Sequence, residues 1–365
     1  MNVKILRVID LYIGSFLSII FGLFSFPSKK NKFERILVIR LWTLGESVMC
    51  LPVIAALKKK FPKAKIDVLA TKRSRDVFTL NPKINEVVEL GLCLIPMFRK
   101  YDLVIDTEPY LRISALASFY LGKRRVGFSH GLRARLYTDR VRFDDNVHTV
   151  ETMLNLTRAV GADLKPESMG RIYVSREDKR KVDFFLKKNG VKKGDVVVGM
   201  CAASAESASE TRRWPAENFA KVADMLIDEM NVKVVFVGGP KDKDLNERII
   251  RMMKNKAMNS AGVLNLKQGV ELMGRCKIFI SNDTGPMHAA AAQGSRVIGL
   301  FGPNTPVRYH PYGKGNISFY KAKHPPCIHT HLEIFPDEDV CGGKCLRAIT
   351  VQEVFEAAKK LLSQR

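Results

Sequence analysis

The sequence KIFISNDTGPMHAAAAQGSRVIGLFGPNTP, residues 277–306, decides the fold, because it reads as strand, turn, helix and second strand. It opens with the apolar, β-branched run 278–280, turns at 281–286 and continues as a helix of small residues at 287–293. Gly294 can end that helix, and a second strand follows at 296–301. This order is typical of a βαβ unit in a parallel sheet, and such sheets bind ligands at the ends of their strands.

The turn at residues 281–286 has the composition of a phosphate-binding site. Asp283 or Thr284 suits the N-cap of the following helix, and Pro286 suits its first position. The turn then presents free backbone N–H groups at the positive end of a helix dipole, which attracts anions. Glycine and proline also make simple tight turns, so this prediction depends on the length of the whole pattern.

Size and charge limit the class of protein. A chain of 365 residues, 46% of them hydrophobic, is long enough for two globular domains with their own cores. Its 60 lysines and arginines against 37 acidic residues give a net charge of +23, which favours polyanionic partners such as nucleic acid, anionic lipid or a phosphorylated substrate. Its 7 cysteines, an odd number spread over a long chain, favour a reducing compartment, with the cytoplasm as the default.

The segment LYIGSFLSIIFGLFSFPS, residues 11–28, has no charged residue and is just long enough to cross a bilayer. One helical face is small and polar, the opposite face is Phe, Leu and Ile, and basic residues flank both ends. The small face consists of Ser15, Ser18, Gly22 and Ser25. We therefore predict that residues 1–30 form a helix lying in an anionic membrane surface. A spanning anchor and a helix packed on the protein stay open. A cleaved signal is disfavoured, because residues 26–28 are not a small-x-small cleavage site.

From residue 35 the chain alternates strands with helices, which is typical of doubly wound parallel sheets. The first half, residues 31–165, is predicted to hold strands at 35–40, 66–70, 86–90, 102–106 and 125–128, with a helix near 48–61. The polar stretch 165–170 is the predicted linker. The second half, residues 171–349, is predicted to hold strands at 196–201, 232–237, 277–281 and 296–301, with a helix at 215–230. Residues 350–365 are predicted to form a core-packing helix.

Three more stretches place charged residues after predicted strands, where open α/β sheets bind their ligands. Glu46 follows the first strand in RLWTLGES, although an acid near a helix N-terminus is also a common structural arrangement. Arg212 and Arg213 precede a helix that starts at Pro215, and guanidiniums bind phosphate through paired hydrogen bonds. Asp242 in the segment GGPKD could hold a ribose hydroxyl or cap its own helix.

Together these stretches resemble glycosyltransferase family 9, the lipopolysaccharide heptosyltransferases, from about Arg35 to the C-terminus. The resemblance rests on ILVIRLWTLGESVMCLPVIAALKKKFP, RRVGF, TRRWP, FVGGPKD, SNDTGPMHAAAAQG and LFGPNTP, in the order and spacing of the family. It implies an α/β protein of GT-B type, with two Rossmann-like doubly wound parallel-sheet domains facing a cleft. The first domain would bind the acceptor and the second the nucleotide-sugar donor. It also implies inverting transfer of heptose from an ADP-sugar, without cofactor or essential metal.

The resemblance also assigns roles to single residues. Glu46 stands where the family has a catalytic aspartate after glycine, and Arg212 stands where it usually has a lysine two residues before Trp-Pro. Both residues keep the charge of the family's residue but change its geometry. Asp242 stands at the family's acidic ribose contact. The family's donor-phosphate loop is matched directly by Asp283, Thr284, Gly285 and His288.

The implied chemistry is a single displacement, in which a carboxylate takes the proton of an acceptor hydroxyl as that oxygen attacks the anomeric carbon. The leaving diphosphate would be stabilised by the helix N-terminus after Asp283 and by Arg212, Arg213 and His288. We therefore expect a cytoplasmic enzyme, peripheral to the inner face of the cytoplasmic membrane, that transfers heptose from ADP-heptose to the inner core of lipopolysaccharide, on its Kdo or heptose sugars.

Two other functions stay open: transfer from another nucleotide sugar, and a non-catalytic nucleotide-binding module. Nucleic acid is not an expected partner, because no motif of aromatic and basic residues for base stacking stands out. A structural zinc also stays open beside free thiols, since the cysteines and histidines near the C-terminus are zinc-ligand types with loose spacing. These residues are Cys327, His329, His331, Cys341 and Cys345.

Overall fold

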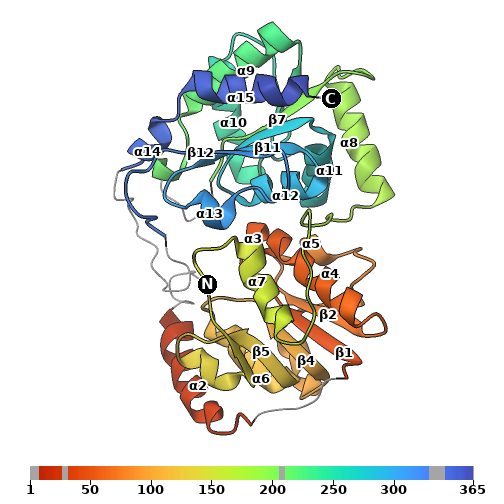
Figure 1. The fold of residues 1–365 in the computed structure, drawn as a ribbon. Coiled ribbons are helices and arrows are strands. Elements are labelled where there is room, and N and C mark those ends of the chain that lie inside the picture. Colours follow the sequence, from red (N-terminus) through yellow and green to blue (C-terminus); the bar gives the residue numbers. More distant parts are fainter. Residues whose placement is uncertain (1–7, 27–31, 205–209, 329–341, 365) are drawn as a thin grey trace. The chain divides into compact units, whose positions relative to one another are not determined.

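The computed structural model describes residues 8–26, 32–204, 210–328 and 342–364. The chain divides into two compact units, of which the first ends at Pro166 and the second begins at Glu167. Each unit is built on its own six-stranded sheet (Figure 1). Both sheets are parallel and doubly wound, so the predicted α/β class with two Rossmann-like domains of GT-B type is confirmed.

The sheet of the first unit has the strand order β3-β2-β1-β4-β5-β6. Its central strands are mostly apolar because helices cover both faces; Ile36 of β1, for example, pairs with Ile66 on one side and Leu103 on the other. The strands are β1 (Arg35–Ile39), β2 (Lys65–Ala70), β3 (Glu86–Glu89), β4 (Tyr101–Asp106), β5 (Gly122–Phe128) and β6 (Asp139–Val141).

Right-handed crossovers decide which helices cover each face of this sheet. The chain moves one way across the sheet from β1 to β3 and the opposite way from β3 to β6, so the two sets of connections lie on opposite faces. One face carries α3 (Leu44–Met49), α4 (Leu51–Lys60), α5 (Arg75–Phe78) and α7 (Thr149–Arg158). The other face carries η1 (Asp10–Gly14), α2 (Ser15–Gly22), η2 (Leu92–Met97), α6 (Arg112–Leu121) and η3 (Leu132–Leu136).

The N-terminal helix, η1 with α2, packs on α6 and η3 through its small residues. The carboxylate of Asp10 accepts hydrogen bonds from the backbone N–H groups of Arg112 (2.9 Å) and Ile113 (2.7 Å) at the start of α6. Gly14 lies so close to α6 that a Cβ at this position would be 2.6 Å from the Cβ of Arg112. Ser18 is fully buried. The predicted small face therefore contacts the protein, and the large apolar side chains of the opposite face are exposed.

The second unit repeats the architecture, with the strand order β12-β11-β10-β7-β8-β9. Its strands are β7 (Val197–Cys201), β8 (Lys233–Phe236), β9 (Met258–Asn259), β10 (Ile278–Asn282), β11 (Arg296–Phe301) and β12 (Ile317–Tyr320). One face is covered by α9 (Ala216–Met230), α10 (Lys243–Met252) and α15 (Val351–Ser363), and the other by α8 (Arg176–Lys188), α11 (Leu266–Arg275) and α12 (Gly285–Gln293). The shorter helices are η4 (Glu210–Arg212), η5 (Pro240–Asp242), α13 (Pro306–Tyr309) and α14 (Lys344–Arg347).

Strand order reverses beside the first strand of each sheet, between β1 and β4 in the first unit and between β7 and β10 in the second. At such switch points the neighbouring loops leave in opposite directions, which opens a crevice at the carboxyl ends of the strands. The residues that follow β1, β4, β7 and β10 therefore lie where a ligand is expected in each unit.

Most predicted elements are present, with two kinds of difference. The helix predicted near 48–61 is two helices, α3 and α4, because Thr43 caps a helix that starts earlier and Pro52 lies in the first turn of the next. The edge strands β6, β9 and β12 were not predicted. Gly294 ends α12 in the left-handed conformation (φ 95°), as expected.

Candidate active site

Glu46 lies in the first turn of α3, directly after β1. Thr43 is the N-cap of this helix: its Oγ1 accepts the Glu46 backbone N–H (3.3 Å) and donates to the Glu46 carboxylate (2.9 Å). The Glu46 side chain is 14% exposed. The carboxylate is thus fixed in direction while one side of it stays open to solvent.

Arg40, directly after β1, forms an ion pair with Glu46. Its guanidinium is fully buried, contacts the Glu46 carboxylate, donates to the Thr107 carbonyl oxygen (3.0 Å) and lies 3.5 Å from the carboxylate of Glu108. Neither Arg40 nor Glu108 was predicted as a site residue. The available signal was their position, since each charged residue directly follows or closely follows an otherwise apolar central strand.

Glu108 holds the loop between β1 and α3. Its carboxylate accepts hydrogen bonds from the backbone N–H groups of Leu41 (2.6 Å) and Trp42 (3.2 Å). Complete burial raises the pKa of the Glu108 carboxyl, although the Arg40 charge opposes the shift. Glu108 therefore stabilises this loop from inside the protein and has no access to a substrate.

The other ionisable groups at this strand edge are also closed to a substrate. Asp106 is fully buried and accepts hydrogen bonds from Tyr137 (2.6 Å), Ser114 (2.8 Å) and Arg133 (2.8 Å). Burial raises the pKa of the Cys50 thiol to about 11, so this thiol stays protonated at neutral pH. Among Glu46, Asp106, Glu108 and Cys50, only Glu46 can meet a bound hydroxyl.

Replacing Arg40 by methionine is expected to lower the free energy of unfolding by roughly 3–5 kcal/mol, because the buried carboxylate of Glu108 and the partly buried carboxylate of Glu46 lose their counter-charge. Urea unfolding measures this. A matched control is Arg75→Met, which removes a surface pair with Glu89 (3.4 Å) and should cost at most about 1 kcal/mol. Equal losses in the two variants would show that the buried pair has no special weight.

In the second unit, the predicted phosphate loop lies at the start of α12. Thr284 is the N-cap in extended conformation, and its side chain makes no capping hydrogen bond to the helix. Gly285 is the first helical residue. Pro286 is therefore at the second position of the helix, whereas the sequence predicted it at the first. His288 lies in the first turn and is buried. The Thr284 hydroxyl therefore does not cap this helix, whose positive end suits an anion.

Arg212 and Asp283 are brought together at this loop. The Arg212 guanidinium lies 3.7 Å from the Asp283 carboxylate, and the side chain of Asn304, from the segment after β11, donates to the same carboxylate. Both members of the pair are partly exposed. Asp283 thus aligns Arg212 beside the N-terminus of α12. Asn304 was not predicted as part of this site, although it belongs to the LFGPNTP motif.

Trp214 anchors the segment that contains Arg212 and Arg213 to the sheet. Its backbone N–H donates to the Asn282 side chain (3.0 Å) at the end of β10, and its indole N–H donates to the Ile349 carbonyl oxygen (2.8 Å). Asn282 in turn donates to the Ala202 carbonyl oxygen (2.8 Å) at the end of β7. These buried bonds connect both strands of the switch point to the residue that follows Arg212 and Arg213.

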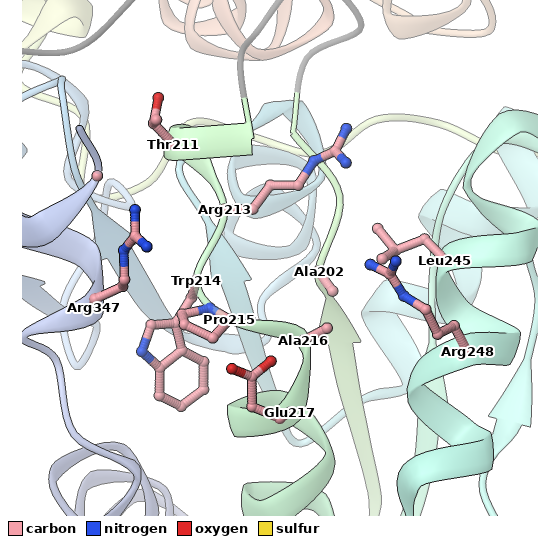
Figure 2. Close-up of a pocket in the computed structure, with 11 residues that line it drawn as sticks. Ala202, Thr211, Arg213, Trp214, Pro215, Ala216, Glu217, Leu245, Arg248 and Arg347 are labelled. Atoms are coloured by element: carbon pink, nitrogen blue, oxygen red, sulfur yellow. The ribbon is translucent and has the colours of Figure 1, made fainter.

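Arg213 lines a separate pocket of about 410 Å³. Figure 2 shows Trp214, Pro215 and Glu217 between Arg347 on one side and Arg248 on the other. The Arg213 guanidinium also donates to the Ser204 hydroxyl (2.9 Å). Three guanidiniums and one carboxylate around this space favour an anionic ligand group.

Asp242 is engaged in its own turn. Its carboxylate accepts the Gly239 backbone N–H (2.7 Å) at the start of η5, which is the capping alternative that the sequence left open. A ribose contact by Asp242 stays a prediction and would use its remaining acceptor capacity.

No group of three or more His, Cys, Asp or Glu side chains suited to a metal occurs among the residues that the structure describes. Cys341, His329 and His331 lie outside the described residues, so the alternative of a structural zinc, which the sequence left open, is not tested. Cys327 and Cys345 are buried.

Comparisons with known proteins place the chain in context. The sequence model of glycosyltransferase family 9 (heptosyltransferase) matches residues 97–333. Lipopolysaccharide heptosyltransferase 2 of Escherichia coli K12 is 28% identical over 356 residues, which cover 90% of this chain and 99% of that protein. The enzyme of the same name from Salmonella typhimurium is 27% identical over 358 residues, with 90% and 99% covered.

Solved structures of glycosyltransferases are also similar to this chain. A family 9 glycosyltransferase of Veillonella parvula superposes with a TM-score of 0.77 at 26% identity, covering 91% of this chain and 99% of that one. The ADP-heptose lipopolysaccharide heptosyltransferase II of E. coli superposes with a TM-score of 0.72 at 25% identity, covering 90% and 98%.

Proposed function

Because this chain belongs to glycosyltransferase family 9, the heptosyltransferase family, we propose that it transfers heptose from ADP-heptose to the inner core of lipopolysaccharide. The observation that carries the proposal is that relatives named lipopolysaccharide heptosyltransferase align over 99% of their own length. The acceptor is a Kdo or heptose sugar of the lipid A-linked core. In the reaction a C–O bond forms between the acceptor oxygen and the anomeric carbon, the bond from that carbon to the diphosphate breaks, and ADP leaves.

The donor half of the site belongs to the second unit. The diphosphate of ADP-heptose binds at the N-terminus of α12, formed by Asp283, Thr284 and Gly285, with His288 in the first turn. Arg212 supplies the charge that stabilises the leaving diphosphate, and its pairing with Asp283 (3.7 Å) supports this role by aligning it in advance. Arg213 adds positive charge from the pocket that it lines, and Asp242 contacts the ribose.

The acceptor half belongs to the first unit. Glu46 takes the proton from the acceptor hydroxyl as that oxygen attacks. Its partial exposure, and the complete burial of Asp106 and Glu108, support this assignment. Arg40 and Thr43 hold the carboxylate in one orientation, so little reorganisation is needed during the attack.

Titration calorimetry with ADP, GDP and UDP tests which nucleotide the donor sugar carries. ADP is expected to bind most tightly, and Asp283→Asn is expected to weaken its binding by removing the carboxylate that aligns Arg212. Tighter binding of GDP or UDP would favour the alternative, a transferase for another nucleotide sugar. Binding of a nucleotide without any sugar transfer would favour a non-catalytic module.

The N-terminal helix is the basis for a finer proposal, that the enzyme binds peripherally to the inner face of the cytoplasmic membrane. Among the residues that the structure describes, no helix combines the length and the apolar character needed to cross a bilayer. Several large side chains are exposed on the outward face of η1 and α2 and on the two residues just after α2, which suits a helix lying in the interface. They are Tyr12, Ile13, Phe16, Leu23 and Phe24.

Intact protein is expected to bind vesicles of anionic phosphatidylglycerol more tightly than neutral phosphatidylcholine vesicles, and less tightly as salt rises, because headgroup attraction is screened beyond a Debye length of ~8 Å at physiological salt. Phe16→Ser with Leu23→Ser should abolish this binding in a sedimentation assay. Deletion of residues 1–30 is a poorer test, since it uncovers the surfaces of α6 and η3 that the small face contacts. Unchanged binding by the double variant would contradict the proposal.

A further inference from the structure

Exposed apolar side chains gather on one face of the first unit. Apart from Leu80, every exposed large hydrophobic residue that the structure describes in this unit lies on the N-terminal helix or the residues just after it, or on η2, α6 and η3. Crossover handedness puts η2, α6 and η3 on the same face of the sheet, opposite α3, α4 and α5, and the N-terminal helix packs on α6 and η3 of this face. A one-sided apolar layer of this extent is uncommon on a free surface and marks a contact with a partner or a membrane.

The segment η2 is the second centre of this layer. Leu92, Ile95 and Phe98 are 84%, 65% and 61% exposed. Their backbone is held by Tyr120 at the end of α6, whose hydroxyl donates to the Ile95 carbonyl oxygen and whose carbonyl oxygen accepts the Arg99 N–H (2.9 Å). The exposed side chains are therefore presented by a fixed turn.

Arg99 adds a further sign of constraint. It adopts a left-handed backbone (φ 47°), which costs energy for a residue other than glycine. Immediately before it, the Phe98 ring contacts the Tyr120 ring at a centroid distance of 5.2 Å and keeps most of its surface in solvent. A strained turn that keeps an aromatic ring exposed is typical of a contact site.

The charges of this face are of one sign. Residues 92–100, 112–121 and 132–136 contain no acid, and the one acid of the described N-terminal helix, Asp10, is bonded to the start of α6. Two cations on these elements are exposed: Arg99, just after η2, and Arg135 of η3. The Cβ of Arg135 lies close to Gly22, where α2 ends, since a Cβ at Gly22 would be 2.7 Å from it. Exposed positive charge is thus present both at η2 and at the end of the N-terminal helix.

We propose that η2 is a second contact with the anionic bilayer, so that the enzyme binds its membrane through two elements on either side of α6 and not through the N-terminal helix alone. This inference rests on the membrane association proposed above. An anionic bilayer matches both the apolar side chains and the basic residues among them. A second copy of the chain fits less well, because it would bring two positively charged faces together.

The test uses two variants of the full-length protein. The η2 variant combines Leu92→Ser and Ile95→Ser, and the control is Val263→Ser, at a similarly exposed residue of the second unit. Neither change removes a buried side chain, so the thermal midpoint and the affinity for ADP should stay at wild-type values. The η2 variant is expected to bind phosphatidylglycerol vesicles at least about tenfold more weakly, since two inserted aliphatic side chains are lost. Val263→Ser should bind as wild type does.

Three outcomes would overturn the inference, and they can be told apart. Wild-type vesicle binding by the η2 variant, with binding lost in Phe16→Ser/Leu23→Ser, would leave the helix as the membrane contact and remove η2. Wild-type binding by both variants would remove the proposed membrane association itself. Light scattering that shows a dimer without lipid, and its loss in the η2 variant, would assign the face to a second copy of the chain.

Discussion

Glu46→Gln is expected to lower kcat by at least about 100-fold while the affinity for ADP stays unchanged, because a neutral amide cannot take the acceptor proton at neutral pH. The substitution keeps the size of the side chain. It also keeps an acceptor for the Thr43 hydroxyl and for the Arg40 guanidinium, so the local fold should persist. Donor binding should be independent of the change because the proposed donor residues belong to the second unit.

The chain offers a close control for this variant. Glu353 occupies the same position of its helix as Glu46, with Thr350 as the N-cap, but it lies in α15 and pairs with Lys321 on the surface. Glu353→Gln should leave kcat unchanged and cost only the small energy of a helix cap. Activity of Glu46→Gln within a few-fold of Glu353→Gln would remove Glu46 from the role of base.

Arg212→Ala is expected to reduce kcat by at least about 100-fold, because its charge matters most as negative charge develops on the departing diphosphate. Arg212→Lys should recover part of the rate, since the charge returns without the planar pair of donors. The comparison of kcat with KM decides the role. A loss confined to KM would indicate that Arg212 merely binds the donor in its ground state.

Arg275→Ala is the matched control for Arg212→Ala. Arg275 also lies in the second unit and pairs with acids, Glu271 at 2.7 Å and Asp183 at 3.1 Å, but on the surface of α11. Its loss should change neither kcat nor KM. An equal fall in rate for the two variants would point to a general effect of charge on this basic protein instead of a specific contact with the diphosphate.

The fold was predictable from sequence because its central strands are short, apolar and β-branched and alternate with helices. The strands β10 and β11 illustrate this, since their runs 278–280 and 296–301 appear directly in the sequence. The edge strands were missed because they are very short or half-exposed, as in the two residues of β9 and the intermediate burial of β12. Such strands are defined by pairing with a neighbour and carry little pattern of their own.

The candidate site was predictable only where it is local in sequence. The turn from Asp283 to His288 and the arginine pair before Trp214 could be recognised as motifs. Arg40 and Glu108 could not be paired from sequence, because they follow different strands and become neighbours only when β1 and β4 pair. The same holds for Asn304 with Asp283, which meet through the pairing of β10 with β11.

Product analysis with ADP-heptose and a lipopolysaccharide acceptor that lacks heptose tests the central claim most directly. We predict one added heptose on the acceptor by mass spectrometry, stoichiometric release of ADP, an inverted anomeric centre by NMR, and no product from Glu46→Gln. A sugar added from a GDP- or UDP-sugar, with none from ADP-heptose, would contradict the claim. Binding of ADP-heptose without transfer to any core acceptor would contradict it as well.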